Sequence, residues 1–201
     1  MDYFKRKIDS SLLDWSKDNR HKPLMLRGAR QVGKTTAVCN LGKTFKNFME
    51  INFENKDHAA AKTVFGEHSD PKIICSKLAV LFGKPIVAGE TLLFLDEIQS
   101  CQDAILSLRY FYEQMPELHV IAAGSLLEFA LEELPTFGVG RIESMFMYPF
   151  SFSEFLCAVG YEMWVKIIAE ATPDKPLSNA IHGKIVEQLK NFLIIGGMPE
   201  V

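Results

Sequence analysis

GARQVGKT, the stretch Gly28–Thr35, fits the pattern G-x-x-x-x-G-K-[ST] at every position and decides the fold. A short apolar run, Leu24–Leu26, leads into this stretch, and the residues from Lys34 to Lys43 can form a helix behind it. The two glycines let successive backbone N–H groups converge on an anion, and the helix N-terminus adds its positive dipole end. The sequence therefore predicts a phosphate-binding loop between a strand and a helix.

The lysine and the hydroxyl residue that end the loop predict ATP with magnesium (Mg2+) as the ligand. Lys34 is expected to reach the β- and γ-phosphates, and the Thr35 hydroxyl is expected to bind the metal. For Arg30 a salt bridge that holds the loop is favoured, and contact with the nucleotide is the alternative. The residues expected to bind the nucleotide are Gly28, Ala29, Arg30, Gln31, Val32, Gly33, Lys34, Thr35 and Thr36.

An apolar run that ends in two acidic residues, Leu92–Glu97, is the second element of the predicted site. Such a run is typical of a central parallel strand buried on both faces, where a carboxylate is unfavourable unless its charge is used. Asp96 is expected to hold magnesium through water. Glu97 is expected to polarise the attacking water as a general base. The adjacent pair favours hydrolysis of the nucleotide over mere storage.

Two further polar residues are candidates for contact with the γ-phosphate. Ser125 follows the predicted strand His119–Ala123, where a small hydroxyl can orient water or sense the phosphate. Its alternative role is to cap a helix over Leu126–Glu133. Arg141 follows a glycine and can supply positive charge to the phosphoryl group, from its own chain or from a neighbour in a homo-oligomer. An ordinary surface arginine is the alternative.

Strands that alternate with helices predict an α/β fold whose parallel sheet is covered on both sides. The predicted strands are Leu24–Leu26, Phe48–Phe53, Leu92–Leu95, His119–Ala123 and Met145–Tyr148. Helices are expected over Tyr3–Asp18, Lys34–Lys43, a less regular stretch Lys56–Leu81, and a segment that Asp103 caps and that runs to Gln114.

The pattern changes from Ser151 onward and becomes entirely helical. Ser151-x-x-Glu154 is a capping-box pattern, Gly160 suits a helix end, and Ser178 begins a periodic apolar stretch. We expect two units, a P-loop ATPase core at residues 1–149 and a small helical lid at residues 150–201. The abrupt stop at Val201 is expected to be a cut rather than a natural terminus.

The composition, with 48% hydrophobic and 23% charged residues among 201, is that of a globular protein. The net charge of −3 gives no overall basic field toward nucleic acid or an anionic membrane. We expect a soluble, cytoplasmic protein without a membrane partner, because no signal peptide follows the basic start and no run approaches the roughly 18 apolar residues of a span. Four isolated cysteines indicate reduced thiols rather than a zinc site.

Five motifs, in order, resemble a large family of prokaryotic ATPases of the AAA+ superfamily: GARQVGKTT (Gly28–Thr36), LLFLDEIQ (Leu92–Gln99), AAGSLLEFAL (Ala122–Leu131), VGRIESMFMYPFSFSEFL (Val139–Leu156) and GGMPEV (Gly196–Val201). Members of that family are usually longer and carry an uncharacterised, nuclease-like C-terminal domain, which is absent here. The resemblance implies a three-layer αβα P-loop NTPase sheet of order 5-1-4-3-2 with a helical lid.

By matching position, the resemblance assigns the phosphate and magnesium roles to Lys34 and Thr35, and the metal and water roles to Asp96 and Glu97. Ser125 falls at the family's sensor position, and Arg141 falls on its Gly-Arg motif.

An ATPase that couples hydrolysis to a movement between core and lid is the leading hypothesis. One alternative is a nucleotide-dependent switch or scaffold with little turnover. Another is a DNA-acting ATPase that works through the absent C-terminal domain, and an unknown protein or nucleic acid would be the partner. A small-molecule kinase is disfavoured, because residues 150–201 contain no arginine for a lid.

Overall fold

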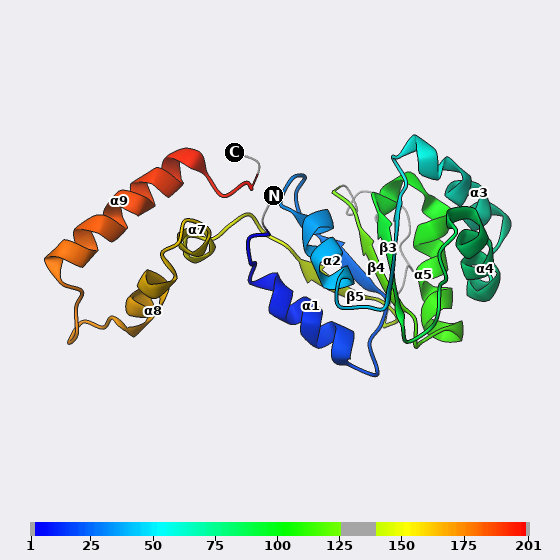
Figure 1. Ribbon diagram of the computed structural model, residues 1–201, viewed down its shortest axis with the longest axis horizontal. Coiled ribbons are helices and arrows are strands. Elements are labelled where there is room, and N and C mark those ends of the chain that lie inside the picture. The colour runs from blue at the N-terminus through cyan, green and yellow to red at the C-terminus, as the bar shows by residue number, and fades with distance from the viewer. Residues whose placement is uncertain (1–2, 126–139, 200–201) are drawn as a thin grey trace.

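The computed structural model describes residues 3–125 and 140–199, which build a central sheet with helices on both faces (Figure 1). The strands are β1 (Leu24–Arg27), β2 (Asn47–Asn52), β3 (Thr91–Asp96), β4 (His119–Ala123) and β5 (Glu143–Phe146). They lie in the order β2-β3-β4-β1-β5, and every neighbouring pair is parallel. Counted from the other edge this is the order 5-1-4-3-2, so the predicted α/β fold is confirmed.

The described helices largely follow the predicted segments. They are α1 (Ile8–Lys17), α2 (Lys34–Gly42), α3 (Ala59–Glu67), α4 (Pro71–Phe82), α5 (Gln102–Gln114), α7 (Phe152–Ala158), α8 (Glu162–Glu170) and α9 (Asn179–Ile195), with short 3-10 turns at η1 (Lys56–His58) and η2 (Ile98–Ser100). The long stretch after η1 is divided because Asp70 caps α4, accepting from the Lys72 N–H, and Pro71 occupies its first turn.

Three predicted boundaries are wrong. The first helix begins at Ile8, because residues 3–6 are not helical and the Arg6 N–H donates to the Asp9 carboxylate at 2.8 Å. The N-cap of α5 is Cys101, and Asp103 lies in the first turn, where its charge still suits the helix dipole. Strand β5 begins at Glu143, because its pairing partner β1 starts at Leu24 and ends at Arg27.

Side chains alternate along the central strands and so supply two separate cores. On β3, Leu93 and Leu95 pack into the cluster beneath α3, α4 and α5. Leu92 and Phe94 pack on the opposite face, in the cluster beneath α1 and α2. All residues of β3 and β4 are buried, as the apolar runs Leu92–Leu95 and Val120–Ala123 predict.

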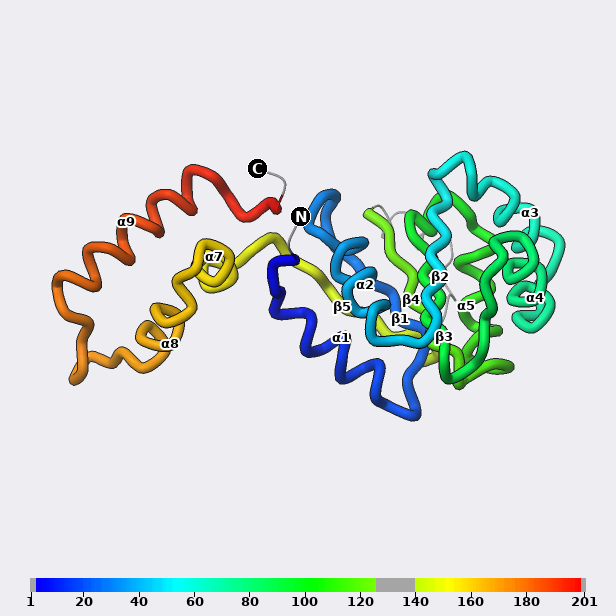
Figure 2. Tube along the Cα trace, in the orientation of Figure 1, coloured from blue at the N-terminus to red at the C-terminus, as the bar shows by residue number. Residues whose placement is uncertain are grey.

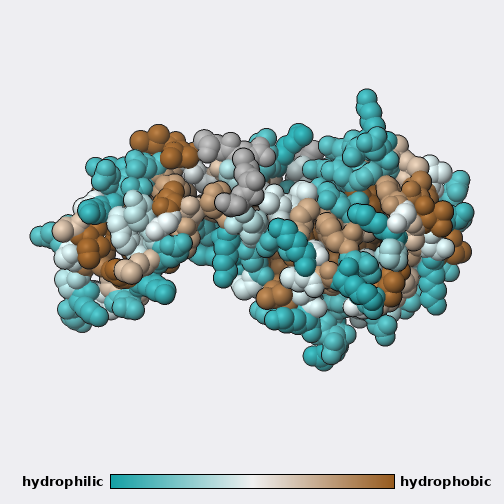
Figure 3. Space-filling model, viewed as in Figure 1, coloured by the Kyte–Doolittle hydropathy of each residue, from teal (hydrophilic) through white to brown (hydrophobic). Residues whose placement is uncertain are grey.

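Helices α7 to α9 form a group to one side of the sheet, joined to it by the segment after β5 (Figures 1 and 2). Inside this group Phe155 packs against Phe192, with ring centroids 5.3 Å apart. Apolar side chains also gather on the surface of α9 (Figure 3), where Leu193 is 72% and Ile194 is 83% exposed. Among the described residues, no helix has both the length and the apolarity needed to cross a lipid bilayer. The predicted division into two units at residue 150 stays a prediction.

Candidate functional site

The loop Gly28–Thr35 joins β1 to α2 at the carboxyl edge of the sheet. Its backbone depends on two glycines, since φ is +148° at Gly28 and +95° at Gly33. A Cβ at Gly28 would lie 2.2 Å from the Met147 carbonyl oxygen, so a larger residue would force this backbone apart. Gln31 has φ of 64°, an unfavourable value for a residue with a side chain. The loop is thus held in a special conformation by its neighbours.

Lys34 folds back over the loop from the first turn of α2. Its Nζ donates to the carbonyl oxygens of Gly28 and Ala29, both at 2.9 Å, and the residue is only 7% exposed. Burial lowers the pKa of Lys34, while the nearby carboxylates of Glu97 and Asp96 raise it, and the net direction is downward. A cation therefore lies at the centre of the loop, satisfied by neutral acceptors alone.

Thr35 and Asp96, which are 61 positions apart, meet at the edge of the sheet. The Thr35 hydroxyl donates to Asp96 Oδ2 at 3.0 Å, and the Glu97 N–H donates to Asp96 Oδ1 at 3.1 Å. Asp96 is 3% exposed, and this burial raises its pKa although both hydrogen bonds act in the opposite direction. A buried carboxylate beside the loop is the feature that the acidic end of β3 predicted.

Asn52 is a member of this cluster that sequence reasoning missed. Its Nδ2 donates to Asp96 Oδ2 at 3.3 Å, and the two residues are paired in register at the ends of β2 and β3. The sequence feature that could have identified Asn52 is its position as the last polar residue of a predicted strand. Because parallel strands end at one edge of the sheet, a polar residue there lies beside the residue that ends the next strand.

Glu97 occupies an unusual backbone conformation directly after β3. Its φ of 48° and ψ of 44° are left-handed, and such strain in a residue with a side chain is concentrated at functional sites. The Gln99 amide Nε2 donates to Glu97 Oε2 at 2.6 Å. Gln99, a second residue that the sequence did not single out, therefore orients the carboxylate of Glu97.

Ser125 and Thr36 also lie near the loop. Ser125 follows β4 and lines a cavity of about 320 Å³ together with Gly28 and Ala29. Thr36 lines a separate cavity of about 310 Å³, with Gln31 and Gly33. The alternative role of Ser125, capping a helix over residues 126–133, falls outside the described residues.

Arg141 lies near the amino ends of the strands, whereas the loop lies at their carboxyl ends. It precedes β5, whose first residue Glu143 pairs with Leu24 at the start of β1, whereas the loop follows the end of β1. Its Nε donates to Glu113 Oε1 at 2.7 Å near the end of α5, and the arginine side chain is 51% exposed. The structure therefore does not bring Arg141 to the loop of its own chain.

The arginine that holds the loop is Arg6 rather than Arg30. Arg30 is exposed, and no ion pair joins it to another described residue, so the expected salt bridge of Arg30 is not seen. Arg6 is 6% exposed, and its Nη1 donates to the Val32 carbonyl at 2.8 Å. No local pattern singles out Arg6, because Val32 lies 26 positions and Glu154 lies 148 positions from it in the chain.

Comparison with known proteins agrees with this geometry. A family model described as an AAA domain matches residues 20–156. A Walker-type ATPase of Pyrococcus abyssi has a similar structure, with a TM-score of 0.53 and 18% identity over 98% of this chain and 65% of its own. At that identity the likeness concerns the fold, and this chain spans 65% of that protein's length.

A second similar structure is a Signal Transduction ATPase with Numerous Domains from Pyrococcus horikoshii, which carries a tetratricopeptide repeat sensor. It is 13% identical, with a TM-score of 0.49 over 98% of this chain and 28% of its own. Comparison with curated proteins finds no match. Because the family model spans most of the chain and coincides with the loop and the sheet, the chain belongs to the AAA domain family of ATP-binding P-loop ATPases.

Proposed function

We propose that this chain hydrolyses ATP with magnesium and uses the turnover to change its conformation. The observation that carries the proposal is the contact between Thr35 Oγ1 and Asp96 Oδ2 at 3.0 Å. It joins a hydroxyl at the end of the phosphate-binding loop to a buried carboxylate at the carboxyl end of β3. Such a pair is what a nucleotide-bound divalent cation requires from a protein.

The donor atoms around Asp96 fit magnesium. Thr35 and Asp96 offer hard oxygen ligands, and magnesium typically takes only one or two from the protein and the others from phosphate and water. The described residues contain no group of three or more His, Cys, Asp or Glu that could hold a metal ion without such help. When bound, magnesium would neutralise charge on the phosphates. Asn52, through its hydrogen bond, would keep the carboxylate directed at that place.

Lys34 and the loop amides would bind the phosphates. The lysine already lies at the loop, where two neutral carbonyl oxygens accept its hydrogen bonds. Phosphate oxygens are charged acceptors and bind an ammonium more strongly than carbonyl groups do. We expect Nζ to exchange at least one carbonyl for phosphate. The cavity beside Gln31, Gly33 and Thr36 offers space for the nucleoside.

Glu97 would act as the general base, held in place by Gln99. Ser125 would sense the γ-phosphate or orient the water. Arg141, remote from its own loop, would act on the site of a neighbouring chain in a homo-oligomer.

Steady-state ATP hydrolysis and calorimetric nucleotide binding test the proposal together. In Glu97→Gln we expect ATP binding to persist while hydrolysis falls roughly 100-fold or more, since a general base contributes about 10²–10⁴ in rate. Glu117→Gln, which alters an exposed carboxylate, is the matched control and should behave like the parent.

Binding of ATP by the parent without measurable hydrolysis would favour a nucleotide-dependent switch or scaffold instead. Hydrolysis that DNA stimulates with a steep salt dependence would favour a DNA-acting ATPase. Failure of the folded protein to bind ATP at all would refute the proposal.

A further inference from the structure

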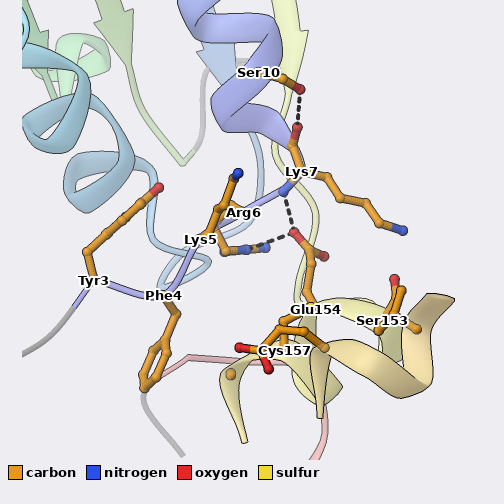
Figure 4. Close-up of a pocket in the computed structure, with 12 residues that line it drawn as sticks. Tyr3, Phe4, Lys5, Arg6, Lys7, Ser10, Ser153, Glu154 and Cys157 are labelled. Carbon is orange, nitrogen blue, oxygen red and sulfur yellow. Dashed lines mark hydrogen bonds and ion pairs between the residues drawn. The ribbon is translucent and has the colours of Figure 1, made fainter. Parts of the chain in front are cut away.

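Arg6 contacts two parts of the chain that are far apart in the sequence, the loop at Val32 and the stretch Tyr148–Glu154. Its Nη1 donates to the carbonyl of Val32 at 2.8 Å, and its Nη2 donates to the carbonyl of Tyr148 at 2.7 Å. Its Nε forms an ion pair with Glu154 Oε1 of α7 at 3.1 Å (Figure 4). The guanidinium carbon also lies 4.0 Å from the ring centroid of Phe150. Every nitrogen of the guanidinium is therefore used, which is the condition for burying such a cation.

The contact with Val32 acts on the geometry of the loop. In a planar trans peptide the C=O and the following N–H point in opposite directions. Because the Val32 carbonyl faces Arg6, the N–H of Gly33 faces the other way. A Cβ on Gly33 would lie 3.6 Å from Arg6 Nη1, so the guanidinium packs directly on this peptide. Arg6 thus sets the direction of an amide that the loop offers to an anion.

The contact with Glu154 extends the connection to α7. Glu154 Oε1 also accepts from the Lys7 N–H at 2.8 Å, while Oε2 accepts from the Ser151 N–H at 2.9 Å and its hydroxyl at 2.8 Å. The same carboxylate completes the capping box that begins α7. Burial raises the pKa of Glu154, but the hydrogen bonds from Lys7, Ser151 and Arg6 outweigh it and leave the pKa below its ordinary value. The first turn of α7 is therefore fixed to the position of Arg6.

We propose that Arg6 is a positioning residue that couples the geometry of the phosphate-binding loop to the placement of α7. The inference rests on the proposed function, because nucleotide in the loop is what would shift the Val32–Gly33 peptide. The guanidinium transmits that shift to Glu154. Its planar, fixed set of donors suits this role, whereas a lysine ammonium cannot contact three acceptors in these directions.

The space around α7 permits such a movement. A cavity of about 780 Å³ separates the N-terminal segment from α7 and α8, and Phe4, Ser10, Cys157 and Val165 are among the residues that line it (Figure 4). The Arg6–Glu154 pair lies at the boundary of this cavity. A shift of α7 can therefore be absorbed there without displacing the sheet.

Hydrogen exchange of backbone amides, followed by mass spectrometry with and without a magnesium-bound, non-hydrolysable ATP analogue, tests the coupling. In the parent we expect the analogue to slow exchange in both the loop and α7. In Arg6→Met we expect the loop still to respond, with nucleotide binding about tenfold weaker, while α7 no longer responds. Arg6→Lys should behave like Arg6→Met. Lys5→Ala removes an exposed charge from the same segment and should match the parent.

Exchange in α4, far from these contacts, reports whether each variant is folded. If Arg6→Met fails that check, Glu154→Gln takes its place: it keeps an oxygen acceptor for the cap, and its α7 response must still fall. An α7 response that persists in the folded variants, or that Arg6→Lys restores in full, overturns the inference.

If the parent binds no nucleotide, the proposed function fails but the role of Arg6 is still tested. Without nucleotide, Arg6→Met must then accelerate exchange in the loop and α7 together, with α4 unchanged. Acceleration in only one of the two segments would also overturn the inference.

Discussion

The imidazole rings of His21 and His119 stack with their centroids 3.8 Å apart, inside the core between α1 and the sheet. Trp15 lies edge-on to both rings, with centroid distances of 5.4 Å. His119 Nε2 lies 3.0 Å from the Ser16 carbonyl and so carries the proton of the neutral ring. No described residue hydrogen-bonds to its Nδ1. Burial, assisted by His21, lowers the pKa of His119 to about 4.

This lowered pKa predicts that acid destabilises the fold. The pKa of His119 is 6.5 in the unfolded chain, its ordinary value, and about 4 in the folded chain. Between these two pH values His119 is therefore protonated in the unfolded chain but not in the folded one. The unfolded state therefore binds more protons, and stability falls as the pH falls through that window, by on the order of 3 kcal/mol in total. Urea denaturation at a series of pH values measures this loss.

His119→Phe provides the control, because it keeps an aromatic ring beside Trp15 but cannot be protonated. Its stability should depend less on pH across the same window, and equal slopes for the two proteins would contradict the prediction.

Gly28→Ala should destabilise the protein and abolish nucleotide binding, because the new Cβ would meet the Met147 carbonyl oxygen at 2.2 Å. Gly83→Ala is the matched control: φ is also positive, at +64°, but nothing lies within 4 Å. We expect roughly 1 kcal/mol of destabilisation for Gly83→Ala and at least about 2 kcal/mol more for Gly28→Ala. Denaturation midpoints and calorimetry measure both effects, and similar values for the two variants would show that the close approach to Met147 is unimportant.

Asp96→Asn should separate stability from function. The substitution removes a buried charge and keeps the oxygen that accepts from Thr35, but it loses the oxygen that accepts from the Glu97 N–H. Because these two effects oppose each other, without magnesium we expect stability to change by no more than about 1 kcal/mol. Nucleotide affinity should depend less on magnesium than in the parent, because Thr35 and the phosphates would still bind the metal. A variant that binds magnesium–ATP like the parent would show that Asp96 is not a metal ligand.

Arg141→Ala should lower ATP hydrolysis, and mixing it with Glu97→Gln should restore part of the activity. The mixture pairs an intact Glu97 in one chain with an intact Arg141 in its neighbour. Glu113→Gln removes only the ion pair with Arg141, and we expect nearly unchanged activity because exposed pairs contribute about 0–1 kcal/mol. ATP hydrolysis by the mixture measures the restored activity, and sizing in the presence of ATP shows whether the chains associate. A mixture no more active than its components would exclude action of Arg141 on a neighbouring chain.

Local chemistry made much of the fold predictable. The loop could be recognised because the two glycines, the lysine and the threonine act within eight consecutive positions, Gly28–Thr35. Strands β3 and β4 could be recognised because burial on both faces demands an unbroken apolar run. The capping box of α7 is likewise a relation between two residues, Ser151 and Glu154, that are one helical turn apart.

The sequence by itself therefore determined the strand, loop and helix of the predicted phosphate-binding site, the acidic end of β3 and the α/β class, because each follows from side chains that are neighbours in the chain. Only the tertiary structure decided that Asn52 supports Asp96 from 44 positions away, and that Arg6 joins the loop to Glu154 from 148 positions away. It also decided that Arg141 lies near the amino ends of the strands, away from the loop. Those relations depend on strand order and on how helices pack. Strand order and helix packing are determined by many contacts between residues distant in the chain, so no local sequence pattern predicts them.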